Sequence, residues 1–290
     1  PRMISLTNHF DVRVAKAAVM ALGAITAWHP GPARMLLRGL SPDGEHVTAG
    51  CAMVAALAGV SDAAPDVDFV RRALSHGDPR ARRVAVESLA TLGIDETRGE
   101  EARRAVVFAL ADEEREVSLA AVRALGRLGH AEPLVALIGS SDERDVIAAT
   151  LRALCEANLH QGLLAARPLV KSGDVAIACA AVEAIRGSSG SLRDDVLFDA
   201  LEHPDPEVVK LALAELSRAP DARALARLGT CLDHASWEVR RLASELLGHS
   251  KVPAAKELLR ARLEREKEPI VRGALTLALS LRPPPKVEDD

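Results

Sequence analysis

One short pattern recurs nine times along this 290-residue chain, at intervals of 29 to 36 residues. Each copy has a small or branched residue, usually followed by a small residue four positions later and a larger aliphatic residue eight positions later. Such positions share one face of an α-helix, so each copy predicts a helix with a narrow buried stripe. The first residues of the copies, here called anchors, are Val14, Val47, Ala81, Val117, Val146, Ile177, Val208, Val239 and Val271.

The start of each anchor helix is also marked in the sequence. An acidic side chain three positions before an anchor can accept hydrogen bonds from the free N–H groups of the first helical turn. Proline follows that position in three copies, where its missing N–H group costs nothing. Glycines such as Gly23, Gly126 and Gly129 are expected to end helices. The acidic residues are Asp11, Asp78, Glu114, Glu143, Asp174, Asp205 and Glu268.

A second, shorter apolar-periodic run lies between successive anchor helices, for example over 34–40, 105–110 and 225–232. Each repeat is therefore expected to be a helix, a tight turn and a helix. Neither helix can bury its apolar face alone, so neighbouring repeats must stack. These patterns predict an all-α solenoid of about nine helix-turn-helix repeats over residues 1–282, followed by a proline-rich acidic linker over 283–290.

The repeat pattern resembles a known family. The arrangement D-P-x-V-R…A…AL-G-x-[LI]-G, clearest in "DPEVVKLALAELS" (205–217) and "WEVRRLASELLG" (237–248), is similar to HEAT repeats, and specifically to the short variety named after the phycobilisome lyases. The chain has neither the tyrosines of TPR units nor the TPLHxA turn of ankyrin units. The resemblance implies a right-handed superhelix, and it is much more specific for fold than for function.

Composition and motifs argue against several functional classes. Charged residues make up 27% of the chain and the net charge is −4, which favours neither nucleic acid nor an anionic membrane as a partner. We see no membrane-spanning run, no signal peptide and no CxxC pair, so we expect a cytoplasmic protein with reduced cysteines. The sequence contains no HExxH, GxSxG, GxxxxGK[ST] or GxGxxG motif. We therefore expect no catalytic residues, no metal and no cofactor.

The histidines are the first residues to test for a metal site. Metal hydroxylases of the deoxyhypusine type, which are built from HEAT repeats, are recognised by His-Glu dipeptides, and this chain contains none. A side chain that recurs at one repeat position is expected to serve the repeat, here the turn between its two helices. The histidines found five positions before an anchor are His9, His76, His203 and His234.

A local group of arginines raises the possibility of nucleic-acid binding. Acidic residues interleave with this group, and the chain has only two tryptophans to stack on bases, so we favour a solvated, salt-bridged face. An acidic protein partner is the other alternative. The arginines of this cluster are Arg71, Arg72, Arg80, Arg82, Arg83, Arg103 and Arg104.

The positions two and six residues after each anchor are expected to face a concave groove. Met20 and Met53 occupy such positions where charge would be expected, and exposed methionine suits adaptable protein contacts. The alternative is that missing sequence covers the first repeat. The groove residues expected to bind a partner are Lys16, Met20, Met53, Arg83, Glu87, Arg123, Arg152, Glu183, Lys210, Arg241 and Glu245.

Three functional hypotheses follow from these patterns. The leading one is a non-enzymatic scaffold or adaptor that holds a protein or peptide in the groove. The second, implied by the family resemblance, is a partner-assisted chromophore lyase or related transferase, and the third is nucleic-acid binding through the arginine cluster. The apolar first and last anchor helices, over 18–28 and 269–282, also predict that further sequence or a second copy covers at least one end.

Overall fold

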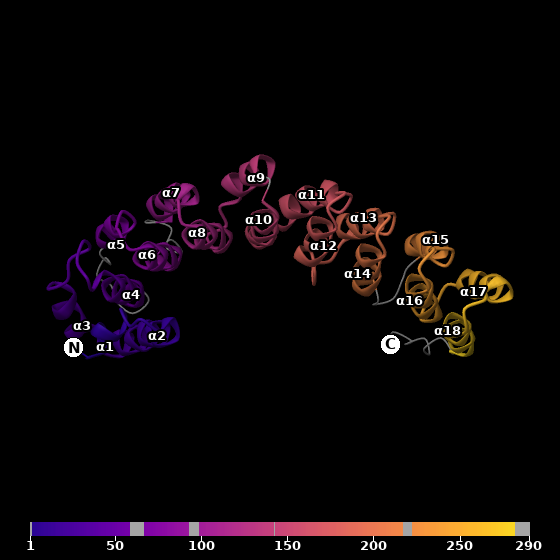
Figure 1. Ribbon diagram of the computed structural model, residues 1–290, viewed down its shortest axis with the longest axis horizontal. Coiled ribbons are helices and arrows are strands. Elements are labelled where there is room, and N and C mark those ends of the chain that lie inside the picture. The colour runs from indigo at the N-terminus through magenta and orange to yellow at the C-terminus, as the bar shows by residue number, and fades with distance from the viewer. Residues whose placement is uncertain (1, 59–66, 93–98, 142, 217–221, 282–290) are drawn as a thin grey trace, which may run out of the picture. The chain divides into compact units, whose positions relative to one another are not determined.

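The structure is a computed structural model that describes residues 2–58, 67–92, 99–141, 143–216 and 222–281. These residues contain eighteen α-helices in sequential pairs, one 3-10 helix and no strand (Figure 1). The expected all-α solenoid of about nine helical pairs is confirmed. The chain forms two compact units, residues 1–158 and 159–290, called unit 1 and unit 2. The predicted linker over 283–290 lies outside the described residues.

Unit 1 contains five helical pairs. The second helices of successive pairs pack on one another, α2 on α4, α4 on α6, α6 on α8 and α8 on α10. They form one layer, here called the second-helix layer, with the first helices packed against it (Figure 1). The helices are α1 (Arg2–Leu6), α2 (Val12–Trp28), α3 (Pro30–Leu37), α4 (Val47–Ala58), α5 (Val67–Ala73), α6 (Pro79–Leu92), α7 (Gly99–Phe108), η1 (Ala109–Ala111), α8 (Arg115–Arg127), α9 (Ala131–Ser140) and α10 (Arg144–Ala157).

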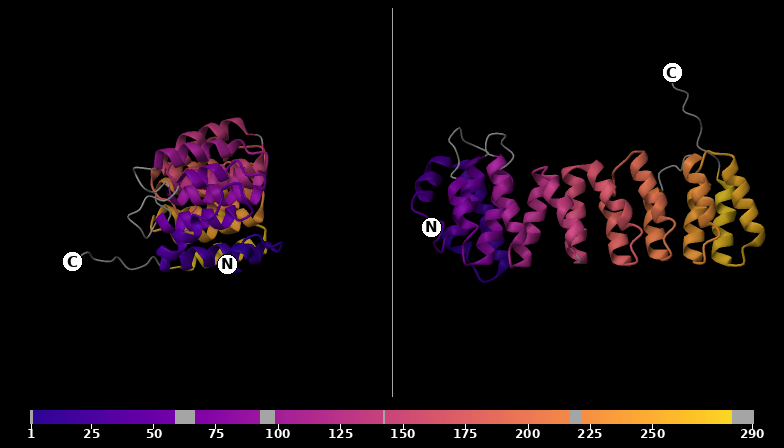
Figure 2. Two further views of the ribbon diagram at one scale, coloured as in Figure 1. Left: turned by 90° about the vertical axis from the view of Figure 1, so that its left-hand side faces the viewer. Right: turned by 90° about the horizontal axis from the view of Figure 1, so that it is seen from above.

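Unit 2 repeats the same arrangement with four pairs. Its second helices stack in the order α12, α14, α16 and α18, and the helices of each pair lie side by side (Figure 2). The helices are α11 (Leu159–Leu169), α12 (Val175–Ala184), α13 (Ser191–Ala200), α14 (Pro206–Leu216), α15 (Ala222–Cys231), α16 (Trp237–Gly248), α17 (Ala254–Arg265) and α18 (Pro269–Ser280).

The middle position of the predicted stripe is buried in every copy, whereas Ala55, Val146, Ile177 and Leu279 at its other positions are only partly buried. The residue four positions after each anchor is at most 4% exposed, because it lies where neighbouring second helices approach most closely. Val14 is an exception among the anchors, with 37% of its surface exposed. It belongs to the first repeat, whose partner helix α1 has only five residues and leaves part of α2 uncovered.

The turn between the two helices of a repeat is held by one recurring hydrogen bond. In eight of the nine repeats, the side chain five positions before the anchor accepts the backbone N–H of the residue two positions later, at 2.9 to 3.2 Å. The four histidines predicted to serve this turn do so through Nδ1. The acceptors are His9, His76, Asp112, Ser141, Ser172, His203, His234 and Glu266.

Whether an acidic residue at a helix start caps that helix depends on the length of its side chain. The four aspartates accept a backbone N–H from the first turn of their helix, at 2.8 to 3.0 Å. The glutamates Glu114, Glu143 and Glu268 make no such bond. Glutamate has an additional methylene group and is not among the preferred N-cap residues. The capping prediction is therefore confirmed for the aspartates and wrong for the glutamates.

Arginines that follow an anchor directly tie neighbouring repeats together. Arg82 donates from Nε and Nη2 to the carboxylate of Asp112 in the next repeat, at 2.8 and 2.9 Å. Its Nη1 donates to the carbonyl oxygen of His76 in its own turn, at 3.0 Å. Arg240 makes the same bidentate pair with Glu266, at 2.8 and 3.1 Å. A planar guanidinium suits this role because its donors form a rigid fork.

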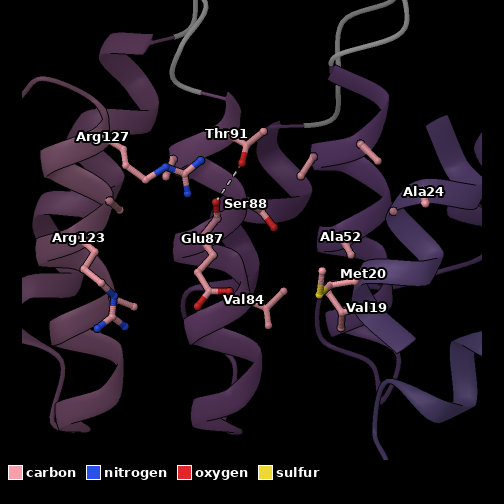
Figure 3. A pocket seen from close by; sticks show the side chains of 16 residues that line it. Val19, Met20, Ala24, Ala52, Val84, Glu87, Ser88, Thr91, Arg123 and Arg127 are labelled. Carbon is pink, nitrogen blue, oxygen red and sulfur yellow. Dashed lines mark hydrogen bonds between the residues drawn. The ribbon is translucent and has the colours of Figure 1, made fainter. Parts of the chain in front are cut away.

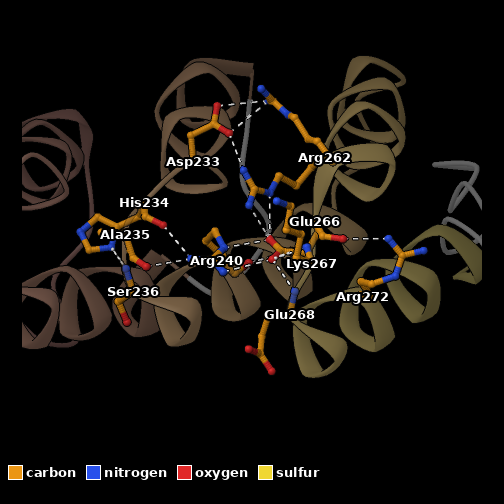
Figure 4. Close-up of polar contacts among 12 residues, drawn as sticks. Asp233, His234, Ala235, Ser236, Arg240, Arg262, Glu266, Lys267, Glu268 and Arg272 are labelled. Carbon is orange, nitrogen blue, oxygen red and sulfur yellow. Dashed lines mark hydrogen bonds and ion pairs between the residues drawn. The ribbon is translucent and has the colours of Figure 1, made fainter.

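Glu266 is the centre of the most extensive of these networks (Figure 4). Its side chain is 2% exposed, and it accepts from Arg240, from Arg262 at 2.6 Å and from the N–H of Glu268 at 3.0 Å. Burial alone raises the pKa of a carboxyl group, but these hydrogen bonds and the adjacent guanidinium groups lower the pKa of Glu266 to about 2. The network joins α16, α17 and the start of α18.

Two glycines around the end of α8 have different roles. A Cβ on Gly126 would lie 2.9 Å from the carbonyl oxygen of Ala153, so its absence lets α8 and α10 pack closely. Gly129 follows the helix with a positive φ of 67°, which favours glycine at a helix end.

Gly23, which was also expected to end a helix, lies in the middle of α2. The predicted helix end is thus confirmed at Gly129 and wrong at Gly126 and Gly23.

The turn histidines are expected to make the folding stability depend on pH, and His234 offers a test. Partial burial and the charge of Arg240 lower the pKa of His234, whose Nδ1 must stay unprotonated to accept from Ser236. An unfolded histidine takes up its proton below about pH 6.5, before the folded one does, so this contribution to stability is lost as pH falls through that value.

We expect the His234→Ser variant to lose less stability than the parent chain between about pH 7.5 and pH 5.5. Serine keeps the acceptor, as Ser141 and Ser172 do in their own turns. Urea titrations at both pH values measure the difference. An equal loss in the two proteins would show that His234 does not titrate with folding.

Candidate functional site

An open groove of about 560 Å³ crosses the second-helix layer of unit 1 (Figure 3). It is called the unit 1 groove, and its lining comes from α2, α4, α6 and α8. Val19 and Met20 lie at the α2 end, and small residues such as Ala52 form the part that α4 contributes. At the other end the lining is polar, with Arg123 and Arg127 on α8.

The charges of the unit 1 groove are not neutralised within the described part of the chain. Arg123 and Arg127 are exposed, and neither has a carboxylate partner there. Glu87 on α6 also lacks a cationic partner among the described residues, although its carbonyl oxygen accepts from Thr91 at 3.3 Å. One turn earlier on α6, Nε of Arg83 is buried without a hydrogen-bond partner. The groove therefore combines an apolar end with unpaired hydrogen-bonding groups.

Most of the predicted partner-binding positions in unit 1 reach the surface, with one correction. Lys16, Glu87, Arg123 and Arg152 are exposed, and Arg83 is half-buried. Met20 is 68% exposed. Met53 was expected in the groove but is fully buried.

The burial of Met53 has a clear cause. Met53 packs with Ile4, Leu22 and Ala33, because helices α1, α2 and α3 enclose this side of α4. The interpretation of Met53 as an exposed contact residue is therefore wrong. Arg127 was missed by the sequence analysis, although it continues the same face one turn beyond Arg123.

The corresponding face of unit 2 differs in its charges. Lys210 lies 2.7 Å from Glu207 and 3.2 Å from Glu238, and Arg241 lies 2.6 Å from Glu245. These predicted partner-binding cations are thus neutralised within the unit. Glu183 is exposed.

A small pocket also lies on this face of unit 2. It has a volume of about 220 Å³ and is lined by Leu213, Leu242, Glu245 and His249, among others. This pocket is less than half the volume of the unit 1 groove, and its only carboxylate is already paired with Arg241.

The arginine cluster considered for nucleic acid is largely paired with carboxylates. Arg71 contacts Asp68, Arg72 contacts Asp43 and Arg82 contacts Asp112. Glu100 pairs with both Arg103 and Arg104. Arg80 and Arg83 have no such partner in the described residues. Pairing leaves little of the positive field that a phosphate backbone requires.

Groups suited to covalent or metal chemistry do not gather in the described residues. All four cysteines are free thiols. Burial raises the pKa of Cys51 to about 12 and those of Cys155 and Cys231 to about 11, which opposes thiolate formation. Within the described ranges, no three His, Cys, Asp or Glu side chains converge as a metal site would require. Nor does any described helix have the length and apolar character needed to cross a bilayer.

The two terminal repeats expose apolar side chains, as the sequence suggested. On α2, Ile25 is 48% exposed and Trp28 83% exposed. On α18, Ile270 is 53% exposed and Leu277 62% exposed. Whether another segment or a second copy covers these faces stays a prediction.

A family model described as HEAT repeats matches residues 67–155 and 194–280, together more than half of the chain. This chain belongs to the HEAT-repeat family. The first match lies within unit 1 and the second within unit 2, so both units are HEAT-repeat arrays. No curated protein sequence matches the chain.

One solved structure of low identity shares the fold, and two others are similar with lower TM-scores. A chain of the Kap95:Nup1 complex is 13% identical with a TM-score of 0.56, over 95% of this chain and 44% of that one. This chain therefore spans less than half the length of that protein. Human deoxyhypusine hydroxylase in complex with glycerol is 18% identical (TM-score 0.36, 88% of this chain and 96% of that one). An engineered protein is 19% identical (TM-score 0.37, 96% and 76%).

Proposed function

We propose that this HEAT-repeat chain is a non-enzymatic scaffold that holds a segment of another protein in the unit 1 groove. The observation that carries the proposal is the combination in one groove of the exposed Met20 with Arg123 and Arg127, which have no carboxylate partner among the described residues. A bound polypeptide can bury an apolar side chain that is 68% exposed and can pair with these two cations. We also propose that the repeats are of the short, phycobilisome-lyase-like variety, on the sequence pattern alone.

The alternatives have less support. A chromophore lyase that uses a thiol nucleophile needs a cysteine of lowered pKa, whereas burial raises the pKa of all four cysteines. Nucleic-acid binding through the arginine cluster needs unpaired cations, and five of its seven arginines contact carboxylates. The same fold in a chain of the Kap95:Nup1 complex is consistent with an interaction role but does not identify a partner.

Site-specific photo-crosslinking tests the proposal. A photoreactive amino acid replaces Thr91, which lines the groove but is not part of the proposed contacts, or, as a matched control, Arg104 on the opposite helical layer. Both positions are exposed. In cells that express the chain, we expect protease-sensitive adducts at position 91 and about tenfold fewer at position 104. Adducts only at position 104 would move the binding surface to the first helices, and none at either position would contradict the scaffold function.

A further inference from the structure

The charges and shape of the unit 1 groove also specify the kind of segment that fits it. We infer that its occupant is an acidic polypeptide segment with a large apolar side chain, which lies at the α2–α4 end while the acidic side chains lie at α8. This inference rests on the proposed function and names the chemistry of the partner.

The apolar end of the groove has room for one large side chain. Met20 and Val19 extend from α2, and the facing surface of α4 consists of alanines such as Ala52 and Ala56 (Figure 3). Small side chains leave a hollow beside the exposed Met20, whose flexible thioether can adapt to an incoming group. Burial of a Leu, Met or Phe side chain here removes apolar surface of both molecules from water.

The other end of the groove is suited to binding carboxylates. Arg123 and Arg127 are one helical turn apart on α8 and have no carboxylate within the described residues, so both guanidinium groups are available to a partner. A carboxylate can accept two parallel hydrogen bonds from each, a strong charge-assisted arrangement. Such a contact would give Arg123 and Arg127 the carboxylate pairing that other arginines of unit 1, for example Arg82 and Arg104, already have within the chain.

Two observations favour an acidic peptide over a nucleic acid. Glu87 lies between the apolar and the cationic ends, where it would repel the evenly spaced phosphates of a nucleic acid, whereas a peptide can place a neutral residue there (Figure 3). Among the described residues, the lining of the groove contains no aromatic side chain on which a base could stack. The matching positions of unit 2 do not compete for the peptide, because Lys210 and Arg241 are already paired.

The geometry sets the spacing within the peptide. Packed helices lie about 8–10 Å apart, so two helical steps from α4 to α8 cover about 16–20 Å. An extended chain advances about 3.3 Å per residue. The apolar residue and the acidic residues should therefore be separated by about five or six positions.

A display library of random 12-residue peptides, selected against the full chain, is the first experiment. We expect enriched peptides with Leu, Met or Phe and, about five or six positions away, two or more Asp or Glu residues. Fluorescein-labelled copies of these peptides then give Kd values by anisotropy for the parent chain and its variants.

Three variants separate the contributions of the cationic end and the apolar end to peptide affinity. The double variant Arg123→Glu, Arg127→Glu should raise Kd at least about tenfold, and Met20→Asp should do so by a similar factor. The control is Lys251→Glu, Arg260→Glu, which makes the same change in net charge at exposed residues of unit 2 without partners in the described chain. The control should change Kd less than about threefold. Circular dichroism checks that each variant is folded.

Each other outcome has a definite meaning. Neutral or basic peptides that respond to Met20→Asp but not to the arginine changes would overturn this inference and leave the proposed function standing. Peptides insensitive to all groove variants, or no selected peptides, would contradict both. If a 20-base-pair DNA duplex displaces the peptide with steep salt dependence and an acidic peptide of scrambled order does not, the groove binds nucleic acid and the inference is wrong.

Discussion

Replacing Glu266 by glutamine is expected to cost about 3–5 kcal/mol of unfolding free energy, because it leaves the largely buried guanidinium of Arg240 without a counter-charge and leaves Arg262 with Asp233 alone. The side chains of Arg240 and Arg262 are only 12% and 14% exposed, and both are paired with this carboxylate. Urea titration measures the total loss. Hydrogen exchange in α16 and α18 shows whether the interface between these repeats opens first, as expected for a linear array.

The matched control is Glu264→Gln, an exposed glutamate two positions earlier on the same helix. Its replacement should change stability by no more than about 0.5 kcal/mol. The pH dependence gives a second check. Because the pKa of Glu266 is lowered to about 2, its contribution is present near neutral pH and is lost as pH falls from about 4.5 toward 2. A difference between parent and Glu266→Gln that persists at pH 2 would contradict the ionic explanation.

The Leu125→Ala substitution should lower the free energy of unfolding by about 2–5 kcal/mol, because it truncates a fully buried side chain in the stripe of α8. The second helices α6 and α10 pack on either side of α8, so the cavity cannot easily collapse. The same substitution at Leu164, which is 50% exposed, is the control and should cost much less. A loss below about 0.5 kcal/mol for Leu125→Ala in urea titrations would mean that this residue is not part of the core.

The groove was only partly predictable from the sequence. Helical periodicity places Arg123 and Arg127 on one face of α8, since residues four apart are neighbours on a helix surface. It places Met20 and Met53 at equivalent positions too, yet Met20 is exposed and Met53 buried. The difference is that Met53 packs in one core cluster with Ile4 and Ala33 of α1 and α3, whereas Met20 lines the open groove.

The sequence by itself determined the repeat, the buried stripe and most helix starts, because these depend on side chains that lie within one helical turn or one short loop of each other. Some ion pairs join residues three or four apart on one helix, such as Arg241 and Glu245, but tertiary structure decided the pairs between repeats. The partners of Arg82 and Arg240 lie 30 and 26 residues further along the chain, in the next repeat. Whether an arginine meets a carboxylate depends on how two repeats stack, and that stacking leaves Arg123 and Arg127 unpaired in the described chain.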